Sequence, residues 1–215
     1  MRIAMEKALE NLTQDERQSL VDRRPSQEPE LQERVRKIIS RVRSHGDAAL
    51  LEMARSFDGV ALESLEVPPS AWEQALHQLD HRLRENLEEA AENIGAFHRA
   101  QIPEEVRVQI RPGVTLGRRA TPLERVGVYA PGGRAAYPSS VLMGVVPARV
   151  AGVSRIVVCS PPGPSGLPPR EVMAACAMGG ATRLFAVGGA GAMGALAYGT
   201  ETIPRVDAIV GPGNR

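Results

Sequence analysis

The chain has 215 residues, of which 43% are hydrophobic, and this is enough to bury the core of one or two domains. Its 26 basic and 25 acidic residues give a net charge of +1, so charge does not favour binding to nucleic acid or to a membrane surface. No run of about 18 apolar residues occurs, and acidic and basic residues interleave over residues 1–10, unlike a secretion signal. We therefore expect a cytoplasmic protein whose partner is a small molecule.

The sequence divides into three parts. Residues 1–27 are polar and contain a proline break, which predicts a surface arm with one amphipathic helix around residues 7–20. Residues 28–123 carry helical patterns and then a β-hairpin pattern, whereas residues 124–215 alternate strands with helices. We place the domain boundary between these two larger parts near Leu123.

The second part begins with apolar positions at helical spacing as far as Gly46, where the glycine can end the helix. Asp47 can then cap a second helix that closes at Gly59, so the pattern predicts a helical hairpin. A short extended segment over residues 60–67 follows, and Ser70 is expected to cap the third helix.

A long amphipathic helix is predicted over residues 80–101. His77 and His81 have the i, i+4 spacing of a metal-binding pair, but no third ligand is nearby and an exposed polar face explains them equally well, so we predict no metal there. Residues 106–110 and 114–120 alternate on either side of a Pro-Gly turn, which predicts a β-hairpin.

From residue 124 onward, short β-branched runs alternate with helical segments. This alternation predicts an α/β fold with a Rossmann-like, mainly parallel sheet and helices on both faces, preceded by the helical region and the hairpin. Cys159 and Cys176 lie on different predicted elements without C-x-x-C spacing, so we expect them to pack as small buried hydrophobes. The predicted strands are 126–129, 155–159, 183–187 and 208–210, and the predicted helices between them are 139–151, 170–178 and 192–198.

Three of these strands end in glycine loops. In a parallel sheet the three loops share the carboxyl edge, where open α/β sheets bind their ligands. Glycine lets the backbone approach a ligand closely, and a helix N-terminus presents unpaired N–H groups that suit a phosphate. A dinucleotide or phosphate crevice is the leading hypothesis, although turn conformation alone also explains each loop. The loops are Pro131-Gly132-Gly133, Gly188-Gly189-Ala190-Gly191 and Gly211-Pro212-Gly213-Asn214.

Several polar side chains near these loops are candidate ligand contacts. The ring of Tyr129 could stack on a base or on nicotinamide, or could equally belong to the core. Asn214 combines amide donors with a tight turn and suits a ribose or a phosphate. Arg134 is as consistent with a solvated loop as with a phosphate contact, and Ser139 and Ser140 fit helix capping better than anion binding. The first two loops contain no His, Asp or Glu, so no general base is predicted there.

These motifs resemble those of the histidinol dehydrogenase family. The matching stretches are V-G-V-Y-A-P-G-G-R-A-A-Y-P-S-S-V-L-M from Val126, V-G-G-A-x-A-M-x-A-L-A-Y-G-T-E-T-I-P-x-V-D from Val187, and G-P-G-N from Gly211. Earlier segments H-G-D-A-A-L, S-F-D-G and A-F-H-R-A-Q fall in the order that the family has them. The similarity covers residues 31–215.

The resemblance implies a zinc-dependent, NAD-linked enzyme that oxidises L-histidinol through histidinal to L-histidine as an intertwined homodimer. Tyr129 and Asn214 match two positions that contact NAD in the family. A third contact is a glutamine in the family, and Gly191 stands at that position here. This departure is expected to weaken or alter cofactor binding.

Members of the family are considerably longer, and their zinc ligands, catalytic Glu-His pair and substrate-binding serine lie beyond the G-P-G-N loop. We therefore expect this chain to be an N-terminal fragment without catalytic or metal-binding residues of its own, and without turnover when isolated. Its first domain would be incomplete and would expose apolar surface. Two alternatives stay open: a relative that oxidises another small alcohol, and a non-catalytic nucleotide- or anion-binding module.

Overall fold

The computed structural model of the protein describes residues 7–21, 29–132 and 136–213. The chain forms two compact units, Met1–Arg36 and Lys37–Arg215. Leu123 therefore lies inside the second unit, and the domain division predicted near it remains a prediction.

The first unit contains a 3-10 turn, η1 (Leu9–Asn11), and a short helix, α1 (Gln14–Val21). The single helix predicted around residues 7–20 is wrong at its N-terminal end, because a reciprocal cap sets the start of α1. The Glu16 N–H donates to Thr13 Oγ1 at 3.2 Å, and the Thr13 N–H donates to Glu16 Oε2 at 2.9 Å. These two bonds satisfy N–H groups that the first turn would otherwise leave unpaired.

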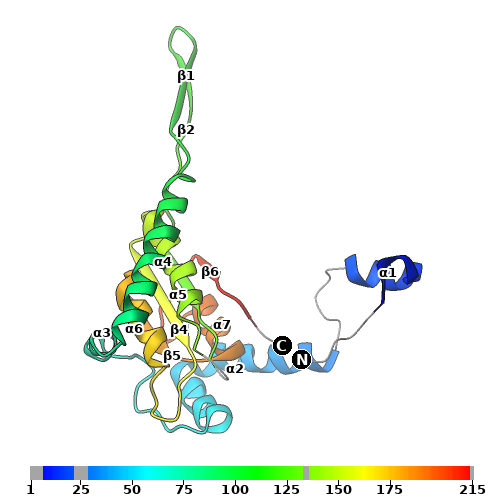
Figure 1. The fold of residues 1–215 in the computed structure, drawn as a ribbon, viewed down its shortest axis with the longest axis vertical. Helices are drawn as coiled ribbons and strands as arrows, with labels where there is room; N and C mark the ends of the chain where they lie inside the picture. Colours follow the sequence, from blue (N-terminus) through cyan, green and yellow to red (C-terminus); the bar gives the residue numbers. More distant parts are fainter. Residues whose placement is uncertain (1–6, 22–28, 133–135, 214–215) are drawn as a thin grey trace. The chain divides into compact units, whose positions relative to one another are not determined.

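The described residues form two sheets, a β1–β2 antiparallel hairpin and a four-stranded parallel sheet in the order β5-β4-β3-β6 (Figure 1). The parallel sheet and the hairpin predicted from the sequence are thus confirmed. The strands are β1 (Val106–Arg111), β2 (Val114–Arg118), β3 (Arg125–Tyr129), β4 (Arg155–Ser160), β5 (Arg183–Ala186) and β6 (Ala208–Val210). The remaining helical elements are α2 (Pro29–Met53), η2 (Ala54–Asp58), α3 (Pro69–His77), α4 (His81–Arg99), α5 (Pro138–Val150), α6 (Arg170–Gly179) and α7 (Gly189–Tyr198).

Helices cover both faces of the parallel sheet, as the sequence predicts. Val128 in β3 points toward α5, where a Cβ built on Gly144 would lie 2.5 Å from Val128 Cγ1. The neighbouring residue, Gly127, faces α7, since a Cβ there would lie 3.0 Å from Leu196 Cδ1. Successive residues of a strand point to opposite faces, so α5 and α7 lie on opposite sides of β3.

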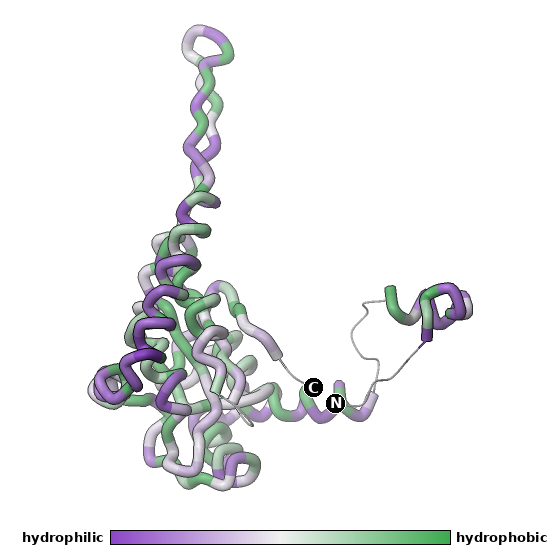
Figure 2. The backbone as a smooth tube through the Cα atoms, in the orientation of Figure 1, coloured by the Kyte–Doolittle hydropathy of each residue, from purple (hydrophilic) through white to green (hydrophobic). Residues whose placement is uncertain are grey.

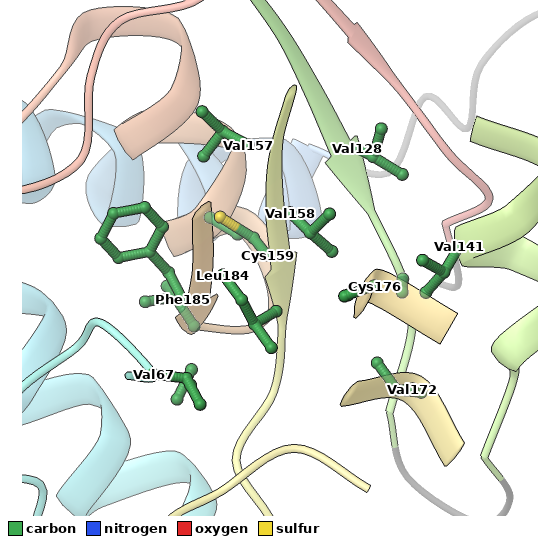
Figure 3. Close-up of a cluster of buried hydrophobic side chains, with 14 of the residues drawn as sticks. Val67, Val128, Val141, Val157, Val158, Cys159, Val172, Cys176, Leu184 and Phe185 are labelled. Atoms are coloured by element: carbon green, nitrogen blue, oxygen red, sulfur yellow. The ribbon is translucent and has the colours of Figure 1, made fainter. Parts of the chain in front are cut away.

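The buried core extends over both faces of the sheet, and one part of it lies between the sheet and the pair α5 and α6. Figure 3 shows Val128 and Val158, from neighbouring strands, beside Val141 of α5 and Cys176 of α6. All four side chains are fully buried. Strands buried on both faces carry nearly continuous apolar runs, and Figure 2 shows the hydrophobic stretches concentrated in the sheet and in the helices beside it.

The segment over residues 60–67, predicted as extended, joins the outer edge of β5 as a short antiparallel bridge. The Val67 N–H donates to the Leu184 carbonyl at 2.8 Å, and the Ala186 N–H donates to the Leu65 carbonyl at 2.7 Å. These bonds satisfy backbone groups on what would otherwise be an open edge of the sheet.

Two capping predictions are wrong. Helix α3 begins at Pro69, and extended Pro68 precedes it, so Ser70 lies inside the first turn. Proline suits the first helical position because it needs no hydrogen-bond partner for an N–H. The predicted break at Gly46 is observed within α2, with φ 51° and ψ −132°, but the carboxylate beside the Asp47 N–H belongs to Glu201, at 2.7 Å.

The β1–β2 hairpin carries apolar side chains that are exposed to solvent. Val106, Val108 and Ile110 alternate with polar residues along β1 and are 43%, 49% and 60% exposed (Figure 2). Leu116 lies opposite Val108 in the register and is 60% exposed. The apolar surface expected from the sequence is therefore present on this hairpin.

Cys159 and Cys176 are fully buried free thiols, which confirms that they pack as small hydrophobes. Burial raises the pKa of Cys159 to about 12 and raises the pKa of Cys176 as well.

We expect neither Cys159 nor Cys176 to react with a disulfide reagent in the folded chain and both to react in denaturant, because the thiolate is the reactive form. A fast reaction of either cysteine in the native chain would contradict this burial.

Arg183 donates two hydrogen bonds to the Glu66 carboxylate, at 2.7 and 2.6 Å, and these bonds lower the pKa of Glu66 below its usual value. Because the folded-state pKa is lowered, the pair stabilises the fold above the unfolded pKa of Glu, and this stability is lost as pH falls through the folded pKa. The side chains of Glu66 and Arg183 are 37% and 36% exposed, so solvent screens the pair. We therefore expect Glu66→Gln to lower the unfolding free energy by about 1 kcal/mol or less at neutral pH.

Urea denaturation of the wild type and of Glu66→Gln over a pH series would measure this effect. The difference in unfolding free energy should shrink as the solution is acidified. A difference that stays constant with pH would show that the charge of Glu66 does not contribute.

Candidate functional site

A cleft of about 440 Å³ opens at the carboxyl edge of the sheet, between the ends of β3 and β6 and the start of α7. In the strand order, β4 and β6 lie on opposite sides of β3, so the cleft coincides with the switch point at which open α/β sheets bind ligands. Its volume falls within the range of about 300–1,000 Å³ typical of small-molecule sites. The lining residues are Tyr129, Gly189, Ala190, Met193, Ile209, Val210, Gly211, Pro212 and Gly213.

Tyr129 links the end of β3 to the start of α7. The N–H of Gly189, the first residue of α7, donates to Tyr129 Oη at 3.0 Å. A tyrosine hydroxyl that accepts this bond still has its own proton to donate to a ligand oxygen. The structure therefore brings Tyr129, predicted as a cofactor contact, into the cleft with a free donor function.

The start of α7 also supplies backbone donors. The Ala192 N–H donates to the Gly188 carbonyl at 3.2 Å, as the first bond of the helix. The N–H groups of residues 190 and 191 come before this bond and have no acceptor within the helix itself. Together with the positive end of the helix dipole, these groups favour an anionic ligand.

Four of the described loop glycines fall into two kinds. A Cβ on Gly132 or on Gly188 would lie 2.9 Å from side-chain atoms of Pro161, so packing against this proline explains both. A Cβ on Gly189 or on Gly213 would meet nothing within 4 Å. The backbone is therefore open to a ligand at these two cleft positions, although the φ of 58° at Gly189 also favours glycine there for conformational reasons.

Gly191 does not line the cleft. It is buried, and a Cβ there would lie 3.2 Å from Leu50 Cδ2 and 3.4 Å from Met53 Sδ, both in α2. The sequence predicted that the helix starts at Ala192, whereas α7 starts at Gly189, so residue 191 belongs to the first turn and faces α2. A Cβ at this position would crowd the Leu50 side chain, and Gly191 itself can offer a ligand only its backbone.

The remaining side-chain candidates contribute less. Asn214 and Arg134 lie outside the described residues. The expectation that Ser139 or Ser140 caps α5 is wrong, because α5 begins at Pro138 and its preceding residue, Tyr137, makes no side-chain cap bond. Among the described residues that line the cleft, Tyr129 is the single titratable group. The cleft can thus bind and orient a ligand, but its described walls supply no carboxylate or imidazole.

No group of three or more His, Cys, Asp and Glu side chains among residues 7–21, 29–132 and 136–213 is arranged to hold a metal ion. His81 Nδ1 instead lies 3.2 Å from the Glu85 carboxylate on the next turn of α4. No helix in the described part of the chain is long and apolar enough to cross a membrane.

Two larger clefts, each of about 600 Å³, lie elsewhere. One is lined mainly by apolar side chains of α5 and of the segment before β3. The other lies beside the proline-rich loop before α6, where the N–H groups of Val172 and Met173 already donate to the Pro169 carbonyl. Neither combines open glycines with a helix start whose donors remain available.

Gly211 brings the end of β6 against the end of β3. Its φ is 139°, and a Cβ there would lie 2.2 Å from the Tyr129 carbonyl oxygen. We expect Gly211→Ala to lower the unfolding free energy by at least about 1–3 kcal/mol. The strained φ of the new alanine and the clash of its Cβ with the Tyr129 carbonyl both oppose the pairing of β6 with β3. Gly213→Ala, two residues away with nothing within 4 Å, is the matched control.

Urea unfolding of both variants would measure the difference. The control is expected to change stability by less than about 0.5 kcal/mol. Equal stability of the two variants would contradict the close approach of β6 to β3.

The model of the family described as histidinol dehydrogenase matches residues 21–215. The chain belongs to the histidinol dehydrogenase family. The histidinol dehydrogenase of Methanosarcina mazei is 50% identical over 215 residues, which cover 100% of this chain and 49% of that protein. That of Methanothermobacter thermautotrophicus is 51% identical over 177 residues, which cover 82% of this chain and 42% of that protein.

A crystal structure of histidinol dehydrogenase from Elizabethkingia anophelis has the same fold, with a TM-score of 0.85 and 32% identity. It matches 95% of this chain, which covers 47% of that chain. The family assignment made from the sequence motifs and the α/β fold are thus confirmed, and the family is one of oxidoreductases. The chain spans about half the length of the relatives that it matches.

Proposed function

We propose that the chain binds NAD in the cleft between β3, β6 and α7, as the nucleotide-binding part of a histidinol dehydrogenase. The observation that carries this proposal is the cleft itself, in which open glycines and the start of α7 meet Tyr129 at the switch point of the sheet. Open α/β sheets bind dinucleotides at this place.

The residues present fit a dinucleotide. A phosphate can approach the backbone at Gly189 and Gly213, where a Cβ would meet nothing within 4 Å, and can accept bonds from the first turn of α7. Tyr129 Oη, held by the Gly189 N–H at 3.0 Å, can donate to a ribose or phosphate oxygen. Bound NAD supplies the acceptor for a hydride, and these residues orient it.

For the whole enzyme we propose the oxidation of L-histidinol through histidinal to L-histidine, with zinc, in the cytoplasm and as a homodimer. The family membership and the half-length match to relatives of that name support this reading. Since the described residues offer no three-ligand metal group, we place the zinc ligands and the proton-transferring groups outside them. We accordingly propose that the 215-residue chain alone does not turn over histidinol.

Substitution of Tyr129 tests the cleft. Tyr129→Phe removes the hydroxyl that accepts the Gly189 N–H and can donate to the ligand, so we expect NAD to bind about fivefold more weakly, as the loss of one hydrogen bond of roughly 1 kcal/mol implies. Tyr129→Ala should weaken binding further because the ring is lost as well. Titration calorimetry with NAD measures both variants.

Tyr198→Phe is the matched control, because Tyr198 is on the last turn of α7, is 49% exposed and does not line the cleft. Wild-type chain that does not bind millimolar NAD, or a Tyr129→Phe variant that binds as the wild type does, would argue against this site. Histidinol-dependent formation of NADH by the purified chain would overturn the proposal that the zinc ligands and the proton-transferring groups lie outside the described residues.

A further inference from the structure

Two glycines of α7, Gly191 in its first turn and Gly194 farther along, lie against α2. A Cβ on Gly191 would lie 3.2 Å from Leu50 Cδ2, and a Cβ on Gly194 would lie 3.4 Å from Val42 Cβ. Leu50 and Val42 are 2% and 1% exposed. Positions 191 and 194 lie on the same face of α7, because residues three apart on a helix are neighbours. Helix α2 is therefore the surface on which the cleft end of α7 is seated.

The part of α2 that contacts Gly191 follows a break in the helix. Gly46 has φ 51° and ψ −132°, so the helix restarts at Asp47 and runs to Met53. A restarted helix needs acceptors for its first N–H groups. Gly46 has no side chain with which to supply one.

Glu201 supplies this acceptor from a distant part of the chain. Its Oε2 accepts the Asp47 N–H at 2.7 Å, and a Cβ on Gly46 would lie 2.0 Å from the same oxygen, so the carboxylate lies directly over the break. This hydrogen bond lowers the pKa of Glu201 below its usual value. A negative charge at a helix start also interacts favourably with the helix dipole.

The loop that carries Glu201 is itself fixed to α7. The Ile203 N–H donates to Thr200 Oγ1 at 3.0 Å, and the Thr200 N–H donates to the Ile203 carbonyl at 2.8 Å, which closes a turn around Glu201. Ile203 is fully buried, and the Val206 N–H donates to the Leu196 carbonyl of α7 at 2.9 Å. The carboxylate is thus presented to α2 from a rigid turn directly after α7.

We propose that Glu201 is a positioning residue for the nucleotide cleft. By capping residues 47–53 it seats Leu50 and Met53 against Gly191, and thereby sets the position of the first turn of α7, whose N–H groups face the ligand. In this arrangement Gly191 lies against Leu50 and Met53 of α2, and it acts on the ligand through its backbone. The effect on nucleotide affinity rests on the proposed function, whereas the effect on α7 does not.

Hydrogen exchange of the chain without nucleotide tests the coupling directly. Glu201→Ala should speed exchange of the amides in residues 47–53 and also of the two hydrogen-bonded amides in residues 189–192, those of Gly189 and Ala192, each by about fivefold, as the loss of a helix N-cap implies. Glu201→Gln keeps an oxygen that can accept the Asp47 N–H and should exchange nearly as the wild type does. Peptides from α6 report whether the rest of the fold is unchanged, and Glu63→Ala removes an exposed carboxylate as a control.

Titration with NAD is the second readout. The affinity for NAD should fall about fivefold in Glu201→Ala, and this factor should match the increase in the exchange rate. Glu201→Gln and Glu63→Ala should both bind NAD nearly as the wild type does. Faster exchange confined to residues 47–53, or wild-type affinity in Glu201→Ala, would overturn the positioning role while leaving the proposed NAD site intact.

If the wild type does not bind NAD, the proposed function fails and the exchange of residues 189–192 alone decides the role of Glu201. If Glu201→Ala does not fold, Glu201→Asp replaces it, because its carboxylate is one methylene shorter and should not reach the Asp47 N–H. The same increase in exchange at residues 189–192 is then expected, and its absence overturns the proposal.

Discussion

The pairing of β6 beside β3 is the constraint on which the cleft depends. At the start of the two strands, the Arg125 N–H donates to Asp207 Oδ2 at 2.8 Å and the Asp207 N–H donates to the Arg125 carbonyl at 2.9 Å. At their ends, Gly211 passes so close to Tyr129 that no side chain fits. With both ends fixed, β6 has one register, and the wall that it forms cannot shift along β3 without breaking the pairing.

Helix α7 connects this wall to the rest of the molecule. Its first residue donates to Tyr129, its body packs on Gly127 through Leu196, and its glycine face lies on α2. The ten residues of α7 therefore contact the cleft at the carboxyl edge of the sheet, the sheet itself and helix α2. This packing of α2 on α7 joins residues on either side of Leu123 within the compact unit Lys37–Arg215. A helix so rich in glycine and alanine allows this close approach on several sides.

Much of the fold could be predicted from the sequence because its signals are local. The apolar run at residues 126–129 and the glycines that follow it specify a strand and a turn without reference to anything distant. The cap supplied by Glu201 could not be predicted, since its partner, Asp47, is 154 positions away. The direction of Gly191 could not be predicted either, because it depends on the helix beginning three residues earlier than the apolar pattern indicates. The position of Tyr129 at the cleft could be predicted because the residue ends a strand beside a glycine loop, and both signals are adjacent in the chain.

The hairpin of β1 and β2 has a consequence for how the chain behaves in solution. Both of its strands are open edges, and an isolated two-stranded ribbon with exposed valine, isoleucine and leucine side chains is a template for adding further strands. Charged residues interrupt such templates, and the ribbon carries Arg107, Arg111 and Arg118 between its apolar positions. These arginines lie outside the core and oppose the addition of strands to the ribbon, so neutralising them is expected to lower the soluble yield before it affects the stability of the parallel sheet.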